Sequence, residues 1–289
     1  MKKLKLSLLL FICSVSFIFC QDDLTELLFD TEYYEAVDQW VIYPNKGKDS
    51  TYIYGMIYLD SKEGFTFRYE SSLKFDKVNI KEIPQKDIKK GLELRLSPQT
   101  KLISVLNKNQ RTFLNLPQTP DWLADKKKES ASVEYLKDIG YHYNHVGASH
   151  LALAPLLEAY KKEPHHKGLE FELSYAYNAL KQFDEAIIVL EKAIDNDSSN
   201  FYFYRELGYA YKNLNKISKA EAVYKIGIAI SNNDFEKSEM AVNMAQSYFE
   251  IRNKEKFEEW AEITLEYAKE DSQYAKYISI FKENWDKEN

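Results

Sequence analysis

The sequence predicts an α+β protein, in which a small β-rich N-terminal domain precedes an all-α superhelix of stacked helix pairs. The superhelix is predicted because one residue pattern recurs at a fixed offset of 34 residues, a period typical of stacked-repeat architectures. The β-rich domain is predicted from two aromatic runs on either side of a short polar turn. A third observation, a short apolar leader, indicates an exported chain.

Residues 1–20 have the composition of a secretory signal peptide. Its charged start consists of Lys2, Lys3 and Lys5. The apolar run at 6–19 is too short for a membrane span, so we expect cleavage after Cys20 and a periplasmic or secreted protein. A lipoprotein signal is less favoured, because Phe19 is large where a small residue is needed. The lysine-rich start and Gln21 resemble those of exported proteins of Bacteroidota.

Composition excludes several classes of function. Both cysteines, Cys13 and Cys20, lie in the leader, so the mature chain can form no disulfide. Removing the three leader lysines reduces 39 Lys and Arg residues to 36 against 45 Asp and Glu, a formal charge of about −9. Nucleic-acid binding depends on basic residues that neutralise phosphates, so it is not expected. No later segment is apolar enough to span a bilayer.

The β-rich domain is expected over residues 21–120. Its first part, 24–40, is expected to be partly helical. The side chains expected on one side of that segment are Tyr34, Val37 and Val41. The aromatic runs 52–59 and 65–69 flank a polar turn and predict a β-hairpin. Further strands are expected at 73–80, 92–96 and 102–106.

A linker is expected at residues 121–132. Its charged run, 126–128, is interpreted as solvated rather than as a binding patch. Trp122 is expected to pack against the first repeat rather than to contact a ligand. Pro117 and Pro120 fit the spacing of a polyproline ligand, which is a weak pattern when it occurs once.

The first repeat occupies residues 133–166. Its first helix places four residues on one face, namely Leu136, Ile139, Gly140 and Tyr143. Gly147 suits a tight turn between the helices. A second apolar stripe follows at Ala152, Leu156 and Ala159. Pro164 ends this second helix, and Pro155 predicts that the helix starts late or is kinked.

Two further copies follow at 167–200 and 201–234, then a degenerate copy at 238–271 and a capping helix at 272–289. Small residues recur where the two helices of a pair are expected to cross: Gly140, Ser174 and Gly208 on the first helix, and Ala152, Ala186 and Ala220 on the second. One pair cannot bury its apolar face alone, so the copies must stack.

The spacing of these residues resembles the tetratricopeptide repeat family. The run that fits the family best is Tyr204, Leu207, Gly208, Tyr211, Ala220 and Tyr224. Ser174 and Gly227 depart from the pattern, where the family has glycine and alanine. The resemblance implies an α-solenoid whose first helices line a concave groove, and it implies a protein or peptide partner.

The resemblance also implies which side chains line the groove. Three tyrosines recur at one repeat position, namely Tyr141, Tyr175 and Tyr209. Tyrosine favours interfaces, although packing between neighbouring first helices is an alternative role. Beside them recur Asn144 and Asn178, with Lys212 at the third place, and on the same side Lys137, Phe171 and Arg205. The amides are expected to pair with a bound peptide backbone.

The family's carboxylate clamp is not expected in this chain. The clamp needs lysine, asparagine and arginine at set groove positions. Lys137 fits one of these positions, but Tyr141 stands where asparagine is required. Recognition of a C-terminal carboxylate is therefore not predicted.

Histidines form the one candidate metal site. His142 and His145 are three residues apart and His150 follows the turn, so zinc or nickel binding is conceivable. Surface or inter-repeat contacts are the favoured interpretation. Sequence motifs for nucleophilic catalysis, phosphate binding and metalloproteases are absent from the sequence. We therefore expect no enzymatic activity, no cofactor and no metal.

The sequence thus predicts an exported, non-enzymatic adaptor of the cell envelope that binds a partner peptide or helix in its concave groove. One alternative is a metal-dependent or hydrolytic enzyme that uses the N-terminal domain or the three histidines. Another alternative is a structural subunit of an envelope complex.

Overall fold

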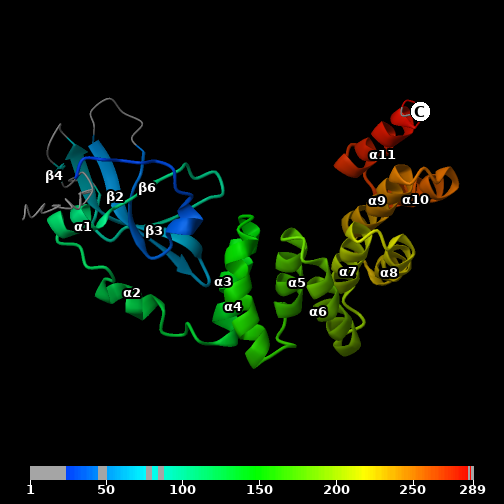
Figure 1. Ribbon diagram of the computed structural model, residues 1–289, viewed down its shortest axis with the longest axis horizontal. Coiled ribbons are helices and arrows are strands. Elements are labelled where there is room, and N and C mark those ends of the chain that lie inside the picture. Colours follow the sequence, from blue (N-terminus) through cyan, green and yellow to red (C-terminus); the bar gives the residue numbers. More distant parts are fainter. Residues whose placement is uncertain (1–23, 45–50, 76–79, 84–87, 286, 288–289) are drawn as a thin grey trace, which may run out of the picture.

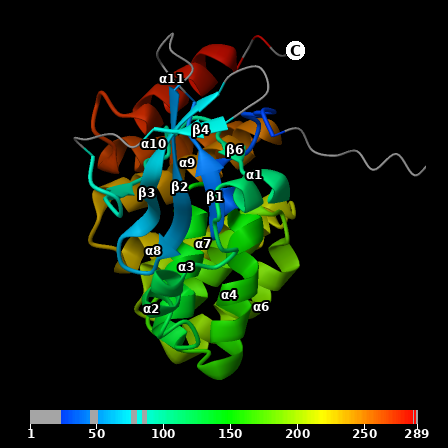
Figure 2. The same ribbon diagram turned by 90° about the vertical axis from the view of Figure 1, so that its left-hand side faces the viewer.

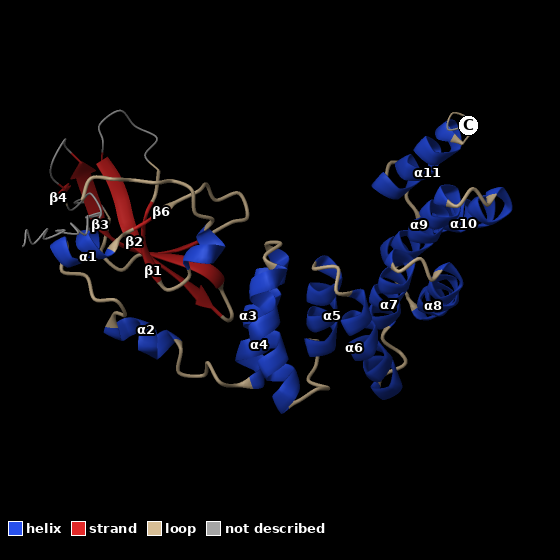
Figure 3. Ribbon diagram, viewed as in Figure 1, coloured by secondary structure: helices blue, strands red, loops and turns tan. Residues whose placement is uncertain are grey.

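The computed structural model places an antiparallel sheet at one end of the chain and a series of helix pairs along an arc beyond it (Figures 1 and 3). It describes residues 24–44, 51–75, 80–83, 88–285 and 287. The predicted fold class is confirmed: a small N-terminal sheet precedes a helical superhelix. The expected signal peptide, residues 1–20, lies outside the described residues. Among the helices described, none combines the length and apolarity needed to cross a bilayer.

The sheet has the strand order β4-β3-β2-β1-β6, and β5 also pairs with β3. Its strands are β1 (Gln39–Ile42), β2 (Thr51–Asp60), β3 (Gly64–Phe75), β4 (Ile80–Glu82), β5 (Glu93–Arg95) and β6 (Ser104–Val105). The predicted hairpin is confirmed and is longer than expected. The pairing of β2 with β3 extends from Asp60 opposite Gly64 at the turn to Thr51 opposite Lys74 at the far end. Gly64 closes the turn at a φ of 81°, which favours glycine.

Side-chain alternation buries both faces of this sheet. One face contains Tyr33, Ile57, Leu59, Phe65, Phe67 and Tyr69. The opposite face contains Trp40, Ile42, Tyr54, Met56, Tyr58 and Leu73. Successive residues of a strand point to opposite sides, so the continuous aromatic runs of the hairpin serve two apolar layers at once.

The segment 24–40, expected to be partly helical, is helical only in the 3₁₀ turn η1 (Tyr33–Ala36), and β1 begins soon after it. Asp38 adopts a φ of 63°, which interrupts the helical path, and Val41 pairs with Gly55 in the sheet. The expected strand at 73–80 is divided between β3 and β4.

Two short helices connect the sheet to the repeats. Helix α1 (Lys108–Phe113) starts at Asn107 with a capping box, and α2 (Asp121–Lys126) lies in the expected linker. The prediction that Trp122 packs on the first repeat is wrong. Its ring lies 5.5 Å from that of Tyr58 and beneath the Arg68 guanidinium, because buried Leu123 anchors α2 to the sheet.

Four helix pairs and a last single helix make up the rest of the described chain. They are α3 (Val133–His145), α4 (Ser149–Lys162), α5 (Leu169–Ala179), α6 (Phe183–Asn196), α7 (Phe201–Asn213), α8 (Ile217–Ile230), α9 (Asp234–Glu250), α10 (Lys254–Tyr267) and α11 (Gln273–Asn284). Pro155 does not delay α4, which begins at Ser149 and continues past the proline.

Close helix crossings explain the small residues of the pattern. A Cβ atom at Gly140 would overlap the Leu156 side chain, and one at Gly208 would overlap the Tyr224 ring. Ala152, the residue expected opposite Gly140, is fully buried. The predicted role of these glycines is confirmed, because a larger residue would push the two helices of a pair apart.

The first helices of successive pairs contact one another, α3 with α5, α5 with α7 and α7 with α9. In Figure 1, α5, α7 and α9 lie on the inner side of the arc, between the sheet and α11. The superhelix therefore has a concave face formed by first helices.

The sheet packs against the first repeat and covers its open end. Figure 2 shows the sheet in front of α3. The Phe65 and Tyr143 rings lie 5.4 Å apart, and the Lys62 ammonium lies 2.8 Å from the Asp138 carboxylate. A terminal repeat needs such a cover, because its apolar face has no neighbouring repeat on one side.

Candidate functional site

Two pockets open on the concave face, one repeat apart. The first groove pocket has a volume of about 230 Å³ and lies between α3 and α5. It is lined by Tyr141, Asn144, His145, Phe171, Glu172 and Tyr175. The second groove pocket has a volume of about 250 Å³ and lies among α5, α7, α8 and α9. It is lined by Tyr175, Asn178, Ala179, Arg205, Glu206, Tyr209, Tyr224, Glu239 and Asn243.

The three recurring tyrosines stand at the rims of these pockets. Tyr141 and Tyr175 flank the first pocket, and Tyr175 and Tyr209 flank the second. Their exposed fractions are 44%, 39% and 38%, so each ring keeps a free face toward the groove. The rest of each ring is buried, so packing against neighbouring side chains accompanies this exposure.

The recurring asparagines occupy a different role from the one predicted. Asn144 Nδ2 donates to the backbone oxygen and the carboxylate of Glu172, both at 2.9 Å. Asn178 Nδ2 makes the same pair of bonds to Glu206, at 3.1 and 2.9 Å. Each amide therefore ties one first helix to the next, and its NH₂ group is not available to a bound peptide backbone. The partner glutamate stands 28 residues later, a spacing that the repeat pattern did not reveal.

The predicted cationic groove residues are also bound within the protein. Arg205 lies 2.6 Å from Glu236 and 2.9 Å from Glu206, with its guanidinium over the Phe171 ring. Lys137 pairs with Glu134 and Asp138, both at 3.1 Å. Lys212 donates to the side-chain oxygens of Asn243 and Gln246, and burial lowers the pKa of Lys212. Arg205 and Lys212 thereby join α7 to α9 of the next repeat, whereas the partners of Lys137 lie on its own helix, α3.

The histidines do not converge on a common point. His142 Nε2 donates to the Ser61 backbone oxygen at 2.9 Å, and His150 pairs with Glu35 at 2.9 Å. The His145 ring stacks on Tyr141 in the groove. Within the described residues no group of three metal-ligating side chains is assembled. The three histidines instead serve the contact with the sheet and the groove wall.

Burial lowers the pKa of His142, and the stability of the protein should depend on pH for this reason. The folded pKa lies below the unfolded value of about 6.5, so the stabilisation is present above that pH and is lost as the pH falls through the folded pKa. We expect His142→Asn to lose less stability than the wild type between pH 7 and 5, measured by urea unfolding. If the free energy of unfolding falls equally in the two proteins over this pH range, His142 is not the cause.

A second histidine, His166, gives the stability the opposite dependence on pH, and it does so equally in the wild type and in His142→Asn. The hydrogen bond of His166 with Glu134 raises the pKa of His166. Its stabilisation is therefore present below pH 6.5 or so and is lost as the pH rises through the folded pKa. Because His166 is unchanged in the variant, the difference between the two profiles isolates His142.

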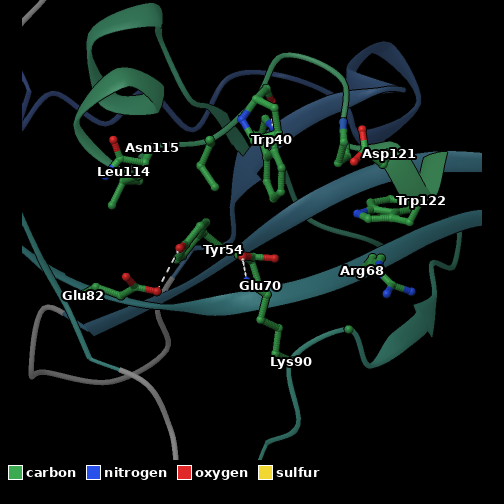
Figure 4. A pocket seen from close by; sticks show the side chains of 14 residues that line it. Trp40, Tyr54, Arg68, Glu70, Glu82, Lys90, Leu114, Asn115, Asp121 and Trp122 are labelled. Atoms are coloured by element: carbon green, nitrogen blue, oxygen red, sulfur yellow. Dashed lines mark hydrogen bonds and ion pairs between the residues drawn. The ribbon is translucent and has the colours of Figure 1, made fainter. Parts of the chain in front are cut away.

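A larger cavity, of about 750 Å³, lies in the sheet domain (Figure 4). Three of the polar side chains that line it have partners within the protein. The Trp40 indole donates to the Pro117 backbone oxygen at 2.7 Å, and the Tyr54 hydroxyl donates to Glu82 at 3.1 Å. Lys90 pairs with Glu70 across the opening.

The comparisons with known proteins concern the repeats. Residues 171–200, which include most of α5 and all of the α6 helix, match the tetratricopeptide repeat family. The predicted resemblance is confirmed for this unit. No curated protein sequence matches the chain.

Several solved structures resemble the chain weakly. A crystal structure of MamA is 20% identical over 50% of this chain and 84% of that one, with a TM-score of 0.45. A tetratricopeptide repeat protein of Thermus thermophilus is 22% identical over 54% and 84%, with a TM-score of 0.45. The first tetratricopeptide repeat domain of human RPAP3 is 23% identical, over 42% of this chain and 96% of that one, with a TM-score of 0.39.

Proposed function

We propose that this protein is a non-enzymatic interaction module whose concave groove binds a segment of a protein partner. The observation that carries the proposal is the row of half-exposed tyrosines at one repeat position, each at the rim of a pocket. Tyrosine combines a large apolar ring with a hydroxyl and loses little entropy on binding, and it is enriched at binding hot spots. The tetratricopeptide match over 171–200 agrees with such a role.

We also propose that the protein is exported and works in the cell envelope. The lysine-rich, apolar leader at residues 1–20 supports this location. The sheet would then serve as the cover of the first repeat, leaving the groove between the sheet and α11 for the partner.

Replacing Tyr141, Tyr175 and Tyr209 together by alanine should abolish most of the binding. A suitable probe is a dodecapeptide selected on the full-length chain from a random library, with its affinity measured by fluorescence anisotropy. Hot-spot residues contribute about 2 kcal/mol each on truncation, so the three together should weaken binding by about 100-fold or more. Circular dichroism checks that the variant is folded.

A matched control removes apolar area from second helices instead. Leu157, Ile188 and Ile226 are 42%, 55% and 47% exposed on α4, α6 and α8. Their triple alanine variant should bind the peptide as the wild type does. Equal loss of binding in both variants, or an unchanged affinity in the tyrosine variant, would overturn the groove as the binding site.

A further inference from the structure

Two residues that line the second groove pocket each carry a buried oxygen that has no hydrogen-bond partner among the described residues. The two oxygens are Asn178 Oδ1 and the Tyr224 hydroxyl. Asn178 is 4% exposed and Tyr224 is fully buried, and both line the pocket. A buried polar group without a partner is destabilising, because it has lost its hydrogen bonds to water. These two oxygens therefore mark a place where a donor from outside the chain would be stabilised.

The orientation of Asn178 is determined by its neighbours. Its amide meets the backbone oxygen and the carboxylate of Glu206, and both groups only accept hydrogen bonds. The NH₂ end must face them, so the Oδ1 atom is left as an acceptor. Tyr224 comes from α8, and its ring lies against Gly208 at the crossing of α7 and α8. This contact fixes the position of the ring, and Tyr224 lines the pocket.

The charge around this pocket is negative. Glu206, Glu236 and Glu239 surround a single guanidinium, that of Arg205. The other nearby cation, Lys212, donates to the side chains of Asn243 and Gln246. Burial raises the pKa of Glu239, whose carboxylate lies 3.8 Å from Arg205 and keeps a third of its side chain exposed. A cation added from outside would neutralise the charge of the Glu239 carboxylate.

Two aromatic rings complete the pocket. Tyr175 and Tyr209 line it and keep more than a third of their surface exposed. The faces of aromatic rings attract cations, and the attraction is stronger where the cation is desolvated. The residues that line the pocket thus combine acceptor oxygens, a carboxylate and two partly exposed aromatic rings.

We propose that the second groove pocket binds a lysine side chain of the partner segment. The proposal rests on the groove binding proposed above and specifies the chemistry of its occupant. An ammonium group carries three donors and no acceptor, which suits Asn178 Oδ1, the Tyr224 hydroxyl and the Glu239 carboxylate together. The first groove pocket repeats part of this arrangement, with Asn144 Oδ1 also unpartnered beside Glu172.

The test uses dodecapeptides selected from a random library on the full-length chain. The selected sequences should be enriched in lysine. The tightest peptide is then synthesised with each lysine in turn replaced by acetyl-lysine, which removes the charge. Hydrogen bonds to charged groups contribute about 1.5–3 kcal/mol, so acetylation of the lysine in the pocket should weaken binding by about 10- to 100-fold.

Two variants locate the effect in the pocket. Glu239→Gln and Tyr224→Phe should each weaken binding of the lysine peptide by about tenfold and leave binding of the acetylated peptide unchanged. Tyr224→Phe should also unfold at a higher temperature than the wild type, because it removes an unpartnered buried hydroxyl. Glu262→Gln, on the exposed face of α10, is the matched control and should bind both peptides normally.

The outcomes separate this proposal from the proposed function. If the tyrosine variant loses binding but acetylation of every lysine is without effect, the groove is the binding site and the lysine pocket is wrong. If acetylation weakens binding equally in the wild type and in Glu239→Gln, the lysine binds elsewhere and the assignment of this pocket is overturned.

Discussion

Replacing Arg205 by alanine should lower the free energy of unfolding by about 3–5 kcal/mol, the cost of breaking a buried ion pair from one side. Its side chain is 15% exposed, and its partners Glu206 and Glu236 are 9% and 10% exposed. Without the guanidinium these carboxylates remain buried and uncompensated. Because Glu236 comes from α9, the change should also weaken the contact between the third and fourth repeats. Urea unfolding measures the effect.

Two comparisons test the cause of this loss. Lys137→Ala removes the cation at the same repeat position in the first unit, where its partners Glu134 and Asp138 both keep a second cation, Lys62. No carboxylate is left unpaired in that variant, so it should lose only about 1 kcal/mol or less. The deficit of Arg205→Ala should also shrink as the pH falls, because protonation removes the unpaired charges. Equal losses in both variants, or a deficit that does not change with pH, would show that charge is not the cause.

Replacing Gly55 by alanine should cost about 3 kcal/mol, at the upper end of overpacking losses. Gly55 lies at the irregularity in the β2–β3 pairing, and a Cβ atom there would overlap the Arg68 backbone oxygen. The same Cβ would lie 2.7 Å from the Phe67 ring. The backbone oxygen belongs to the paired strand and cannot rotate away, so the sheet itself must shift. Thermal and urea unfolding of the full chain measure the loss.

Gly147→Ala distinguishes overlap from backbone conformation. Gly147 has a φ of 78°, but a Cβ atom there meets nothing within 4 Å. Only the conformational cost of a left-handed residue remains, about 1–2 kcal/mol. If Gly55→Ala is no more damaging than Gly147→Ala, the close approach of β2 and β3 is not what requires glycine at position 55.

The repeats were the most predictable part of this chain. Their period appears in the sequence because each pair needs the same small residues at its crossing, as Gly140 and Gly208 show. The hairpin was also predictable, since the two aromatic runs and the polar turn between them are local signals. The segment at 24–40 was not predictable, because its strand forms only by pairing with residues of β2.

The site was predicted in part. The spacing of the tyrosines identified positions that the structure places at the groove, where they remain exposed. The same spacing identified Asn144 and Asn178 but assigned them the wrong partners. Tyr224 was recognised only as part of the repeat pattern, and Glu239 was missed, because the second groove pocket is assembled from four helices that belong to three repeats.

By itself, the sequence determined the repeat period, the pairing of the helices and the positions of the hairpin strands, because these depend on residues close together along the chain. Only the tertiary structure decided which polar groups are satisfied. Asn178 meets Glu206 across two helices, and Trp122 meets the sheet instead of the repeats. Hydrogen bonds and ring contacts between distant segments depend on how elements pack in space, so a pattern along one chain cannot specify them.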